Sequence, residues 1–151
     1  MIFMVELNIP VQDIEIKRIN SKNYIFDFIR KKYLICTPEE WVRQNLVSYF
    51  VNNLNYPKGL IKTESSLKYN NLKKRSDILI FNNDMSHFMI VECKSYKLKL
   101  NKSHLNQSAI YNKIYKSRYL MISNGMEHVV CKYNWKDETF EVKKSIPEFN
   151  N

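Results

Sequence analysis

Two acidic residues and a lysine stand at the ends of two apolar segments. Asp77 opens the segment D-I-L-I-F, and Glu92 and Lys94 end the segment F-M-I-V-E-C-K. Alternate residues of a β-strand point to one face, so Glu92 and Lys94 share a face and Cys93 points away. In an antiparallel hairpin, the start of the first segment lies beside the end of the second. The spacing therefore predicts two carboxylates and an ammonium at one edge of a sheet.

These residue types suit phosphodiester hydrolysis with a divalent cation. Two adjacent carboxylates need a neutralising charge, and Mg²⁺ takes one or two protein carboxylates, several waters and substrate phosphate. Such a site supplies an activated water and a positive centre beside the developing charge. We expect Asp77 and Glu92 to bind Mg²⁺, with Mn²⁺ as a substitute, and Lys94 to orient the water or stabilise the pentacovalent phosphorus. The alternative is a plain salt bridge at a strand end, which is the commoner meaning of an isolated E-x-K.

Periodicity and turn residues predict the elements that hold this site. Thr37 is a good N-cap, Pro38 suits the first helical position, and Glu40 occupies the third helical position, where a capping box has Glu or Gln. The helix that they begin should end near Asn53. A second helix is expected over residues 103–116. Strands are expected over residues 60–64, 75–81, 87–94 and 119–123, with turns at 70–71 and 82–84, and a final hairpin over residues 128–133 and 139–143. Residues 14–22 and 24–35 should be extended or irregular.

This order of elements predicts an α/β (α+β) fold with a central mixed sheet flanked by helices. With 151 residues, of which 44% are hydrophobic, the chain should form a single domain over residues 1–151. The two glycines, Gly59 and Gly125, exclude the glycine-rich phosphate loops G-x-G-x-x-G and G-x-x-x-x-G-K-[ST]. The three histidines do not cluster in sequence, which gives little support to a histidine metal site.

The net charge of +9 favours a polyanionic partner, although Lys-rich composition also follows from biased base composition. Three widely spaced cysteines without paired zinc spacing indicate reduced thiols in the cytoplasm. We expect neither a signal peptide nor a membrane span. Basic side chains around the site are expected to contact DNA, namely Lys73, Lys74, Arg75, Lys97, Lys99 and Lys102. For the lysines after Lys94, a solvated loop is an equal alternative.

The pattern S-D-(x14)-E-C-K on a hairpin resembles the PD-(D/E)XK nuclease superfamily. Five ordered segments are more narrowly similar to the N-terminal nuclease domain of type I restriction enzyme R subunits, including its short standalone versions. They are F-I-R-K-K-Y-L-I-C-T-P-E-E-W-V-R-Q-N, Y-P-K-G-L-I, L-K-K-R-S-D-I-L-I-F, I-V-E-C-K and Y-L-M-I-S-N-G. The resemblance runs over residues 26–149. Ser76 replaces the name-giving proline of the motif, a common departure, and no helicase motor or Walker motif is present in this sequence.

The resemblance implies further site residues. Glu40 corresponds to the acidic residue of the family's first helix and would be a third metal ligand; alternatively, it completes the capping box with Thr37. Gln107 and Tyr111 match a Q-x-x-x-Y motif of RecB-like nucleases, and their i, i+4 spacing places both on one helix face. The alternative is that they are ordinary surface residues of the helix.

The sequence thus predicts a magnesium-dependent deoxyribonuclease of the restriction or defence type, more an endonuclease than an exonuclease. The alternative is a catalytically silent module of nuclease fold that binds DNA or a restriction-modification partner. A third hypothesis is a subunit that acts only when assembled with modification and specificity proteins. The oligomeric state is open, and a homo-oligomer is compatible with the sequence.

Overall fold

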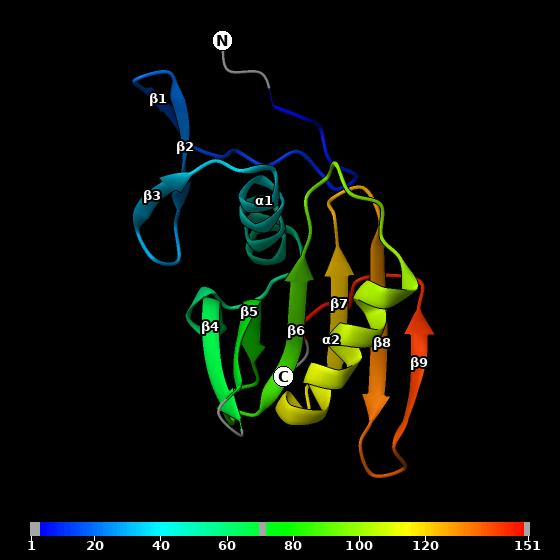
Figure 1. The fold of residues 1–151 in the computed structure, drawn as a ribbon. Helices are drawn as coiled ribbons and strands as arrows, with labels where there is room; N and C mark the ends of the chain where they lie inside the picture. Colours follow the sequence, from blue (N-terminus) through cyan, green and yellow to red (C-terminus); the bar gives the residue numbers. More distant parts are fainter. Residues whose placement is uncertain (1–3, 70–71, 150–151) are drawn as a thin grey trace.

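Six strands form a mixed sheet, and three others form a small antiparallel sheet beside it (Figure 1). The computed structural model describes residues 4–69 and 72–149, and over residues 65–76 it describes the backbone but not the side chains. The large sheet has the order β4-β5-β6-β7-β8-β9. Its strands are β4 (Ile61–Tyr69), β5 (Leu72–Phe81), β6 (His87–Cys93), β7 (Tyr119–Ser123), β8 (His128–Asn134) and β9 (Thr139–Lys143). The predicted mixed sheet flanked by helices is confirmed.

The two helices cover opposite faces of the large sheet. Helix α1 (Pro38–Asn53) packs Val42, Leu46 and Phe50 into the main core with alternate residues of β5 and β6. Helix α2 (Lys102–Tyr115) packs against a smaller cluster on the other face, formed by Leu79, Ile90, Tyr115 and Leu120. The pair β6–β7 is the parallel pair of the sheet, and α2 supplies the crossover that a parallel pair requires.

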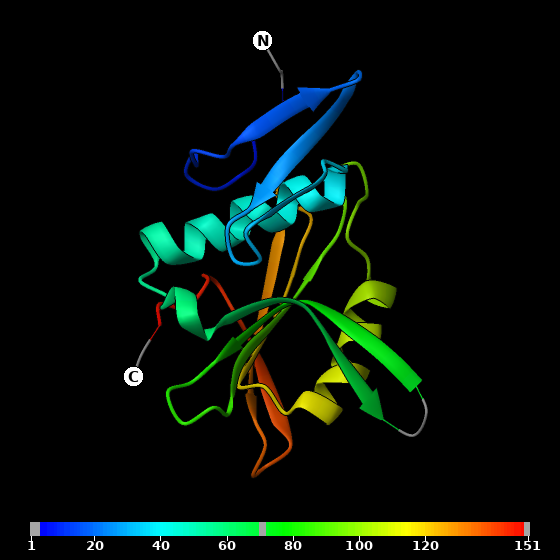
Figure 2. The same ribbon diagram turned by 90° about the vertical axis from the view of Figure 1, so that its left-hand side faces the viewer.

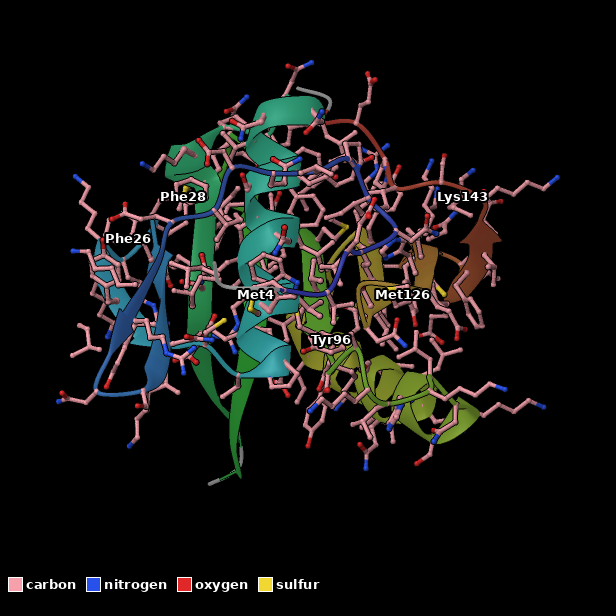
Figure 3. The ribbon with its side chains drawn as sticks, turned by 90° about the horizontal axis from the view of Figure 1, so that it is seen from above. Met4, Phe26, Phe28, Tyr96, Met126 and Lys143 are labelled. Carbon is pink, nitrogen blue, oxygen red and sulfur yellow. The ribbon has the colours of Figure 1, made fainter. Side chains whose placement is uncertain are left out.

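Helix α1 begins where the sequence predicts. Thr37 has extended backbone angles, and its Oγ1 accepts a hydrogen bond of 3.0 Å from the Glu40 N–H. The predicted apolar stripe is present, but polar residues on other sides of this helix are buried as well, among them Arg43, Gln44 and Ser48. Ser48 is covered by the segment before β1, which runs across α1 as the view from above shows (Figure 3), whereas Arg43 contacts Glu64 and Asp77. Trp41 Nε1 donates to the Val5 carbonyl oxygen at 2.8 Å, which fixes that crossing.

The small sheet consists of β1 (Ile16–Ile19), β2 (Lys22–Asp27) and β3 (Lys32–Ile35), so the predicted extended segments are strands. Figure 2 shows it beside α1, away from β6–β9. Asp27, at the end of β2, is fully buried and accepts hydrogen bonds from the backbone N–H of Ile29 and Arg30 at 3.0 Å each. Arg30 Nε adds a 2.8 Å ion pair to the same carboxylate. These bonds stabilise the turn between β2 and β3.

Several element boundaries differ from the sequence prediction. The strand expected over residues 60–64 follows a short 3-10 turn, η1 (Lys58–Leu60), and continues to Tyr69; its partner β5 begins at Leu72 rather than Arg75. The pairs of this long hairpin run from Ile61↔Ile80 to Tyr69↔Leu72. The predicted turn Asn70-Asn71 lies outside the described residues. Within the described part of the chain, no helix is long and apolar enough to cross a membrane. The cysteines are free thiols, and Cys93 and Cys131 are buried.

Candidate active site

The hairpin of β5 and β6 brings Asp77 and Glu92 to facing positions, as predicted. Ile78 pairs with Val91 in an antiparallel ladder, and Asp77 and Glu92 are the next residue on each strand. Beyond the Ile78–Val91 pair, the Asp77 side chain joins β5 to β6, because its Oδ2 accepts a 2.8 Å hydrogen bond from the Cys93 backbone N–H. The carboxylate is thereby fixed at the end of the hairpin where Glu92 and Lys94 also lie.

Asp77 is mostly withdrawn from solvent, with 18% of its side chain exposed. Burial raises the pKa of Asp77 to about 6, because a charged carboxylate loses hydration there. The Cys93 hydrogen bond and the Arg43 charge lower this pKa, whereas the negative charges of Glu39 and Glu92 raise it further. A buried acid facing another acid is the electrostatic setting in which a cation binds favourably.

Each carboxylate oxygen of Glu92 has a neighbour among the side chains that the structure describes. Lys94 Nζ lies 3.4 Å from Oε1, and Ser108 Oγ donates a 3.0 Å hydrogen bond to Oε2. The Lys94 backbone N–H donates to the Ser123 carbonyl oxygen at 2.8 Å, which extends the pairing with β7 beyond β6. Lys94 retains 24% side-chain exposure. The E-x-K pair therefore has the geometry that the sequence predicts.

Arg43 of α1 lies at the centre of the acidic residues. Its Nη1 is 2.6 Å from Glu64 Oε1 and 3.4 Å from Glu40 Oε1, and its Nη2 is 3.4 Å from Asp77 Oδ1. A longer contact of 3.9 Å joins Nη2 to Glu39. Only 6% of the Arg43 side chain is exposed; burial alone lowers the pKa of this guanidinium, but the surrounding carboxylates outweigh it and raise the pKa. Arg43 thus neutralises part of the acidic charge.

Glu40 lies in this network rather than in a reciprocal capping box. The Thr37 N–H donates to the Ile35 carbonyl oxygen, while the Glu40 carboxylate accepts a 3.1 Å hydrogen bond from Gln44 and pairs with Arg43. Burial raises the pKa of Glu40, and the Arg43 charge and the Gln44 hydrogen bond oppose that rise. Its carboxylate therefore faces the interior beside Arg43, so the first helix delivers an acidic residue to this region.

The other sequence-predicted residues lie on α2, in the loop after β6 and on β5. On α2, Gln107 is exposed and Tyr111 is half-buried. Lys97 and Lys99 are exposed in the loop after β6, and Lys102 is exposed at the first position of α2. The backbones of Lys73, Lys74 and Arg75 lie on β5, paired with Lys68, Leu67 and Ser66, but their side chains lie outside the described part of the structure.

The donor chemistry of the site fits a hard divalent cation, because carboxylate oxygens are the ligands that Mg²⁺ prefers. Within the side chains that the structure describes, no group of three or more His, Cys, Asp and Glu is placed to hold one metal ion. Glu40 and Asp77 each pair with Arg43 at 3.4 Å, whereas Glu92 contacts Lys94 and Ser108.

Sequence reasoning missed Arg43, Glu64 and Ser108. Arg43 follows Glu39 and Glu40 by four and three residues, so helical spacing already placed it on their face. Ser108 stands next to Gln107 in the motif N-Q-S-A-I-Y-N, and it is the α2 residue whose hydroxyl contacts Glu92. No local pattern pointed to Glu64, because its role depends on β4 lying against α1.

Comparison with known families matches residues 38–147 to the model of the type I restriction enzyme R protein N terminus. Among solved structures, the chain is similar to one described as a fragment of an HsdR-type subunit of a type I restriction enzyme from Vibrio vulnificus YJ016, at 17% identity and a TM-score of 0.42. That match covers 65% of this chain and 20% of the other, so it spans about a fifth of the solved chain. A search of curated proteins found no match.

The family match covers more than half of the chain and includes α1, Asp77, Glu92, Lys94 and α2. It ends within the last residues after β9. The chain therefore belongs to the family of the type I restriction enzyme R protein N terminus.

Proposed function

We propose that this chain is a magnesium-dependent deoxyribonuclease of a restriction or defence system, of PD-(D/E)XK type, which cuts DNA internally rather than from an end. The observation that carries the proposal is the juxtaposition of Asp77 and Glu92 at one end of the β5–β6 hairpin, with the Lys94 ammonium 3.4 Å from Glu92. Family membership supports the restriction context. Mn²⁺ is proposed to substitute for Mg²⁺, and the setting is proposed to be cytoplasmic.

Each residue of the site has a distinct proposed role. A bound Mg²⁺ would supply an activated water and a positive centre beside the scissile phosphate. Asp77 and Glu92 would hold the ion between them. Ser108, by donating to Glu92, fixes one of these carboxylates on the α2 side. Lys94 adds a positive charge beside the phosphate, where preorganised charges act on the transition state more than on the ground state.

DNA is the proposed partner, together with the modification and specificity subunits of a restriction system. The exposed Lys97, Lys99 and Lys102 follow the E-x-K strand directly, and the net charge is +9. Lysines in such a position neutralise phosphates without reading base sequence. Gln107 and Tyr111 are proposed to place the substrate from the α2 side.

The experiment that tests this proposal compares linear, circular and single-stranded DNA incubated with the parent protein in Mg²⁺, in Mn²⁺ and in a chelator. Cleavage of circular DNA with either metal and none in the chelator is the expected result. Asp77→Asn should abolish both cleavage and the thermal stabilisation that millimolar metal gives the parent. A parent that leaves every DNA form intact with both metals would overturn the catalytic proposal.

A second candidate is a module of nuclease fold that binds DNA or a restriction-modification partner without cutting. The observation that favours it is Arg43, which already supplies Asp77 and Glu40 with positive charge. The two candidates differ in their response to metal. A silent module should keep the same melting temperature with and without Mg²⁺, whereas a site that binds the ion is stabilised by mass action.

A further inference from the structure

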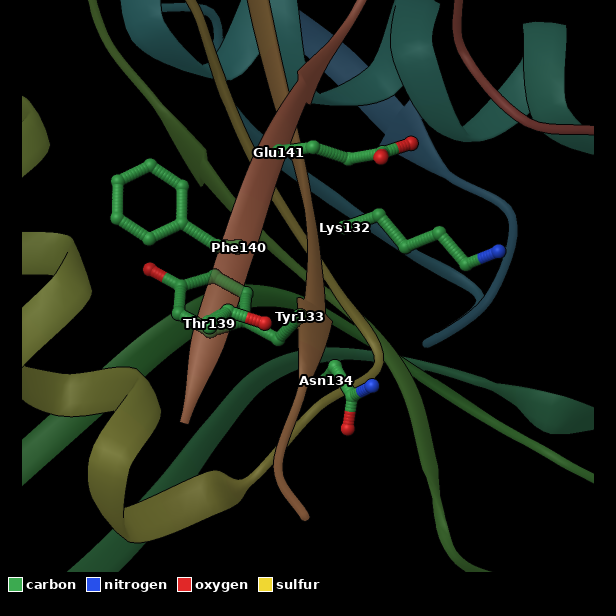
Figure 4. A pocket seen from close by; sticks show the side chains of 6 residues that line it. All are labelled: Lys132, Tyr133, Asn134, Thr139, Phe140 and Glu141. Carbon is green, nitrogen blue, oxygen red and sulfur yellow. The ribbon is translucent and has the colours of Figure 1, made fainter. Parts of the chain in front are cut away.

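Three aromatic rings form a continuous stack on the β8–β9 hairpin. Tyr133 stacks on Trp135 with ring centroids 4.8 Å apart and an interplanar angle of 7°, and on Phe140 at 5.5 Å and 30°. Tyr133 and Phe140 are cross-strand partners, and Trp135 follows in the turn. Figure 4 shows the Phe140 ring directed toward α2, while Lys132 and Glu141 extend on the opposite side of the hairpin.

The stack is rigidly anchored at one end and open at the other. Trp135 Nε1 donates a 2.9 Å hydrogen bond to the Ser117 carbonyl oxygen, just beyond α2. Phe140, at the other end, is 59% exposed. The Phe140 ring stacks on one side against Tyr133, its partner on the neighbouring strand. Its other side faces solvent, and a further flat ring can stack there at little cost in conformational entropy.

A cleft beside the stack combines these rings with positive charge. Its volume is about 510 Å³, and it is lined by Ala109, Lys113 and Lys116 of the α2 region and by Tyr133, Trp135, Glu138 and Phe140 of the hairpin. Lys113 and Lys116 are both exposed, so two cations oppose the single Glu138. The cleft has the size range of small-molecule and nucleotide sites. We call these seven residues the aromatic cleft.

The aromatic cleft lies on the same face of the sheet as Glu92. Ala109, at one end of the cleft, directly follows Ser108, which contacts Glu92. Lys113 and Lys116 lie five and eight residues beyond Ser108, or roughly 8–12 Å along the axis at 1.5 Å per residue. A strand bound in the cleft would therefore lie within a few nucleotides of the candidate active site.

We propose that the aromatic cleft binds single-stranded nucleic acid, with a base stacked on Phe140 and the adjacent phosphates beside Lys113 and Lys116. Sequence-independent strand binding commonly combines these parts, a stacking platform and a basic groove. The proposal concerns binding rather than cutting, and it holds whether or not the β5–β6 site is catalytic.

The test measures the affinity of the full chain for a fluorescent single strand of about 12 nucleotides, by anisotropy in a chelating buffer at low salt. Phe140→Ala should weaken binding by roughly tenfold, within the range for loss of one base stack. Val142→Ala is the matched control, because Val142 lies two residues away on the same strand face, is 64% exposed and carries no ring; it should bind as the parent does. Phe140→Trp keeps an aromatic ring at this position and should bind the strand as tightly as the parent does.

The lysines are tested by salt dependence. Replacing both Lys113 and Lys116 by Gln should reduce the slope of log affinity against log salt by about 1.4, at 0.7 per single-strand phosphate. Equal binding by the parent and Phe140→Ala, or no binding by the parent at low salt, would overturn the proposal. So would light scattering that shows Phe140→Ala breaking up a dimer while strand affinity stays unchanged, because the surface would then join two copies of the chain. Since no metal is present, a parent that never cuts DNA can still pass this test.

Discussion

Arg43 Nη2 lies 3.4 Å from Asp77 Oδ1, and this contact joins the first helix to the hairpin of the candidate active site. The same guanidinium is bound more tightly by Glu64, at 2.6 Å, than by Asp77. Asp77 is therefore a weaker acidic partner of this buried cation than Glu64 is. On the proposed function, a bound metal ion would compete with Arg43 for Asp77.

Arg43→Gln should lower the free energy of unfolding in a chelating buffer by roughly 3 kcal/mol, the low end for breaking a buried pair, because Glu64 and Asp77 keep 22% and 18% exposure. Added Mg²⁺ should recover more stability in this variant than in the parent, because the Arg43 guanidinium no longer competes with the metal ion for Asp77. Urea unfolding with and without Mg²⁺ measures both effects.

The control for that experiment is Arg30→Gln, which breaks the pairs to Asp27 and Glu64 but has no ion pair with Asp77. It should destabilise the protein without increasing the response to Mg²⁺. If Arg43→Gln does not fold, Arg43→Lys replaces it in the experiment, because lysine keeps the positive charge but lacks the planar guanidinium that contacts several carboxylates at once. An equal response to Mg²⁺ in all variants would show that Arg43 and the metal do not share Asp77.

Lys94→Ala should slow the chemical step by roughly 10²–10³-fold, as loss of a transition-state charge does, and leave metal binding nearly intact because an ammonium does not coordinate Mg²⁺. Single-turnover cleavage at saturating DNA measures the step. Lys32→Ala removes an equal charge from an exposed position of β3 in the small sheet and should cleave at the parental rate. A Lys94→Ala variant that matches the parent would remove Lys94 from the site.

Ser108→Ala should weaken Mn²⁺ binding by about tenfold, because the residues that orient a metal ligand typically contribute 10- to 100-fold. The physical reason is the 3.0 Å hydrogen bond that fixes Glu92 Oε2. Ser103→Ala, on an exposed position of the same helix, is the control. Calorimetric titration of Mn²⁺ into both variants gives the comparison, and equal affinities would mean that Ser108 does not position Glu92.

Asp27→Asn should cost about 2 kcal/mol of stability at pH 7, the value for hydrogen bonds to a charged group. Burial alone raises the pKa of Asp27, but hydrogen bonds from Arg30 and Ile29 outweigh it, so the folded pKa lies below the usual value. A lowered folded pKa means that this stability is present above the unfolded pKa, near 3.9, and is lost as pH falls through the folded pKa.

The difference in unfolding free energy between the parent and Asp27→Asn should therefore be constant from pH 7 to about 5 and shrink below about 4. Denaturant unfolding across that range measures it. A difference that persists unchanged into strong acid would show that the asparagine effect is steric rather than electrostatic.

Affinity for duplex DNA should fall steeply with salt, with a log–log slope of about −0.9 for each phosphate that a lysine or arginine neutralises. Lys97→Gln combined with Lys99→Gln should reduce the slope by about 1.8 if both residues contact phosphates. Lys143, which pairs with Glu141 on β9, provides a control site on another strand. An affinity independent of salt would indicate a protein partner instead.

The sequence alone determined the hairpin that carries the site. The alternation of D-I-L-I-F and F-M-I-V-E-C-K and the intervening turn are local features, and local features set strand register. They predicted a hairpin that brings Asp77 near Glu92, and the structure has that register, with Lys94 beside Glu92. Asp77 nevertheless lies within β5 rather than at its start, because β5 continues to Leu72 in its pairing with β4. The start of α1 was equally predictable, because a cap is decided by Thr37 and its next three residues.

Only the tertiary structure decided what surrounds those carboxylates. Arg43 is far in sequence from Asp77 and Glu64, and Ser108 is far from Glu92. These contacts depend on how α1, β4 and α2 pack on β5 and β6. The expected hydrogen bond from the Thr37 N–H to the Glu40 carboxylate is also replaced. The Thr37 N–H donates to the Ile35 carbonyl oxygen, and Glu40 pairs with Arg43. Burial makes a counter-charge worth more than a local hydrogen bond in water, and burial is a property of the assembled fold.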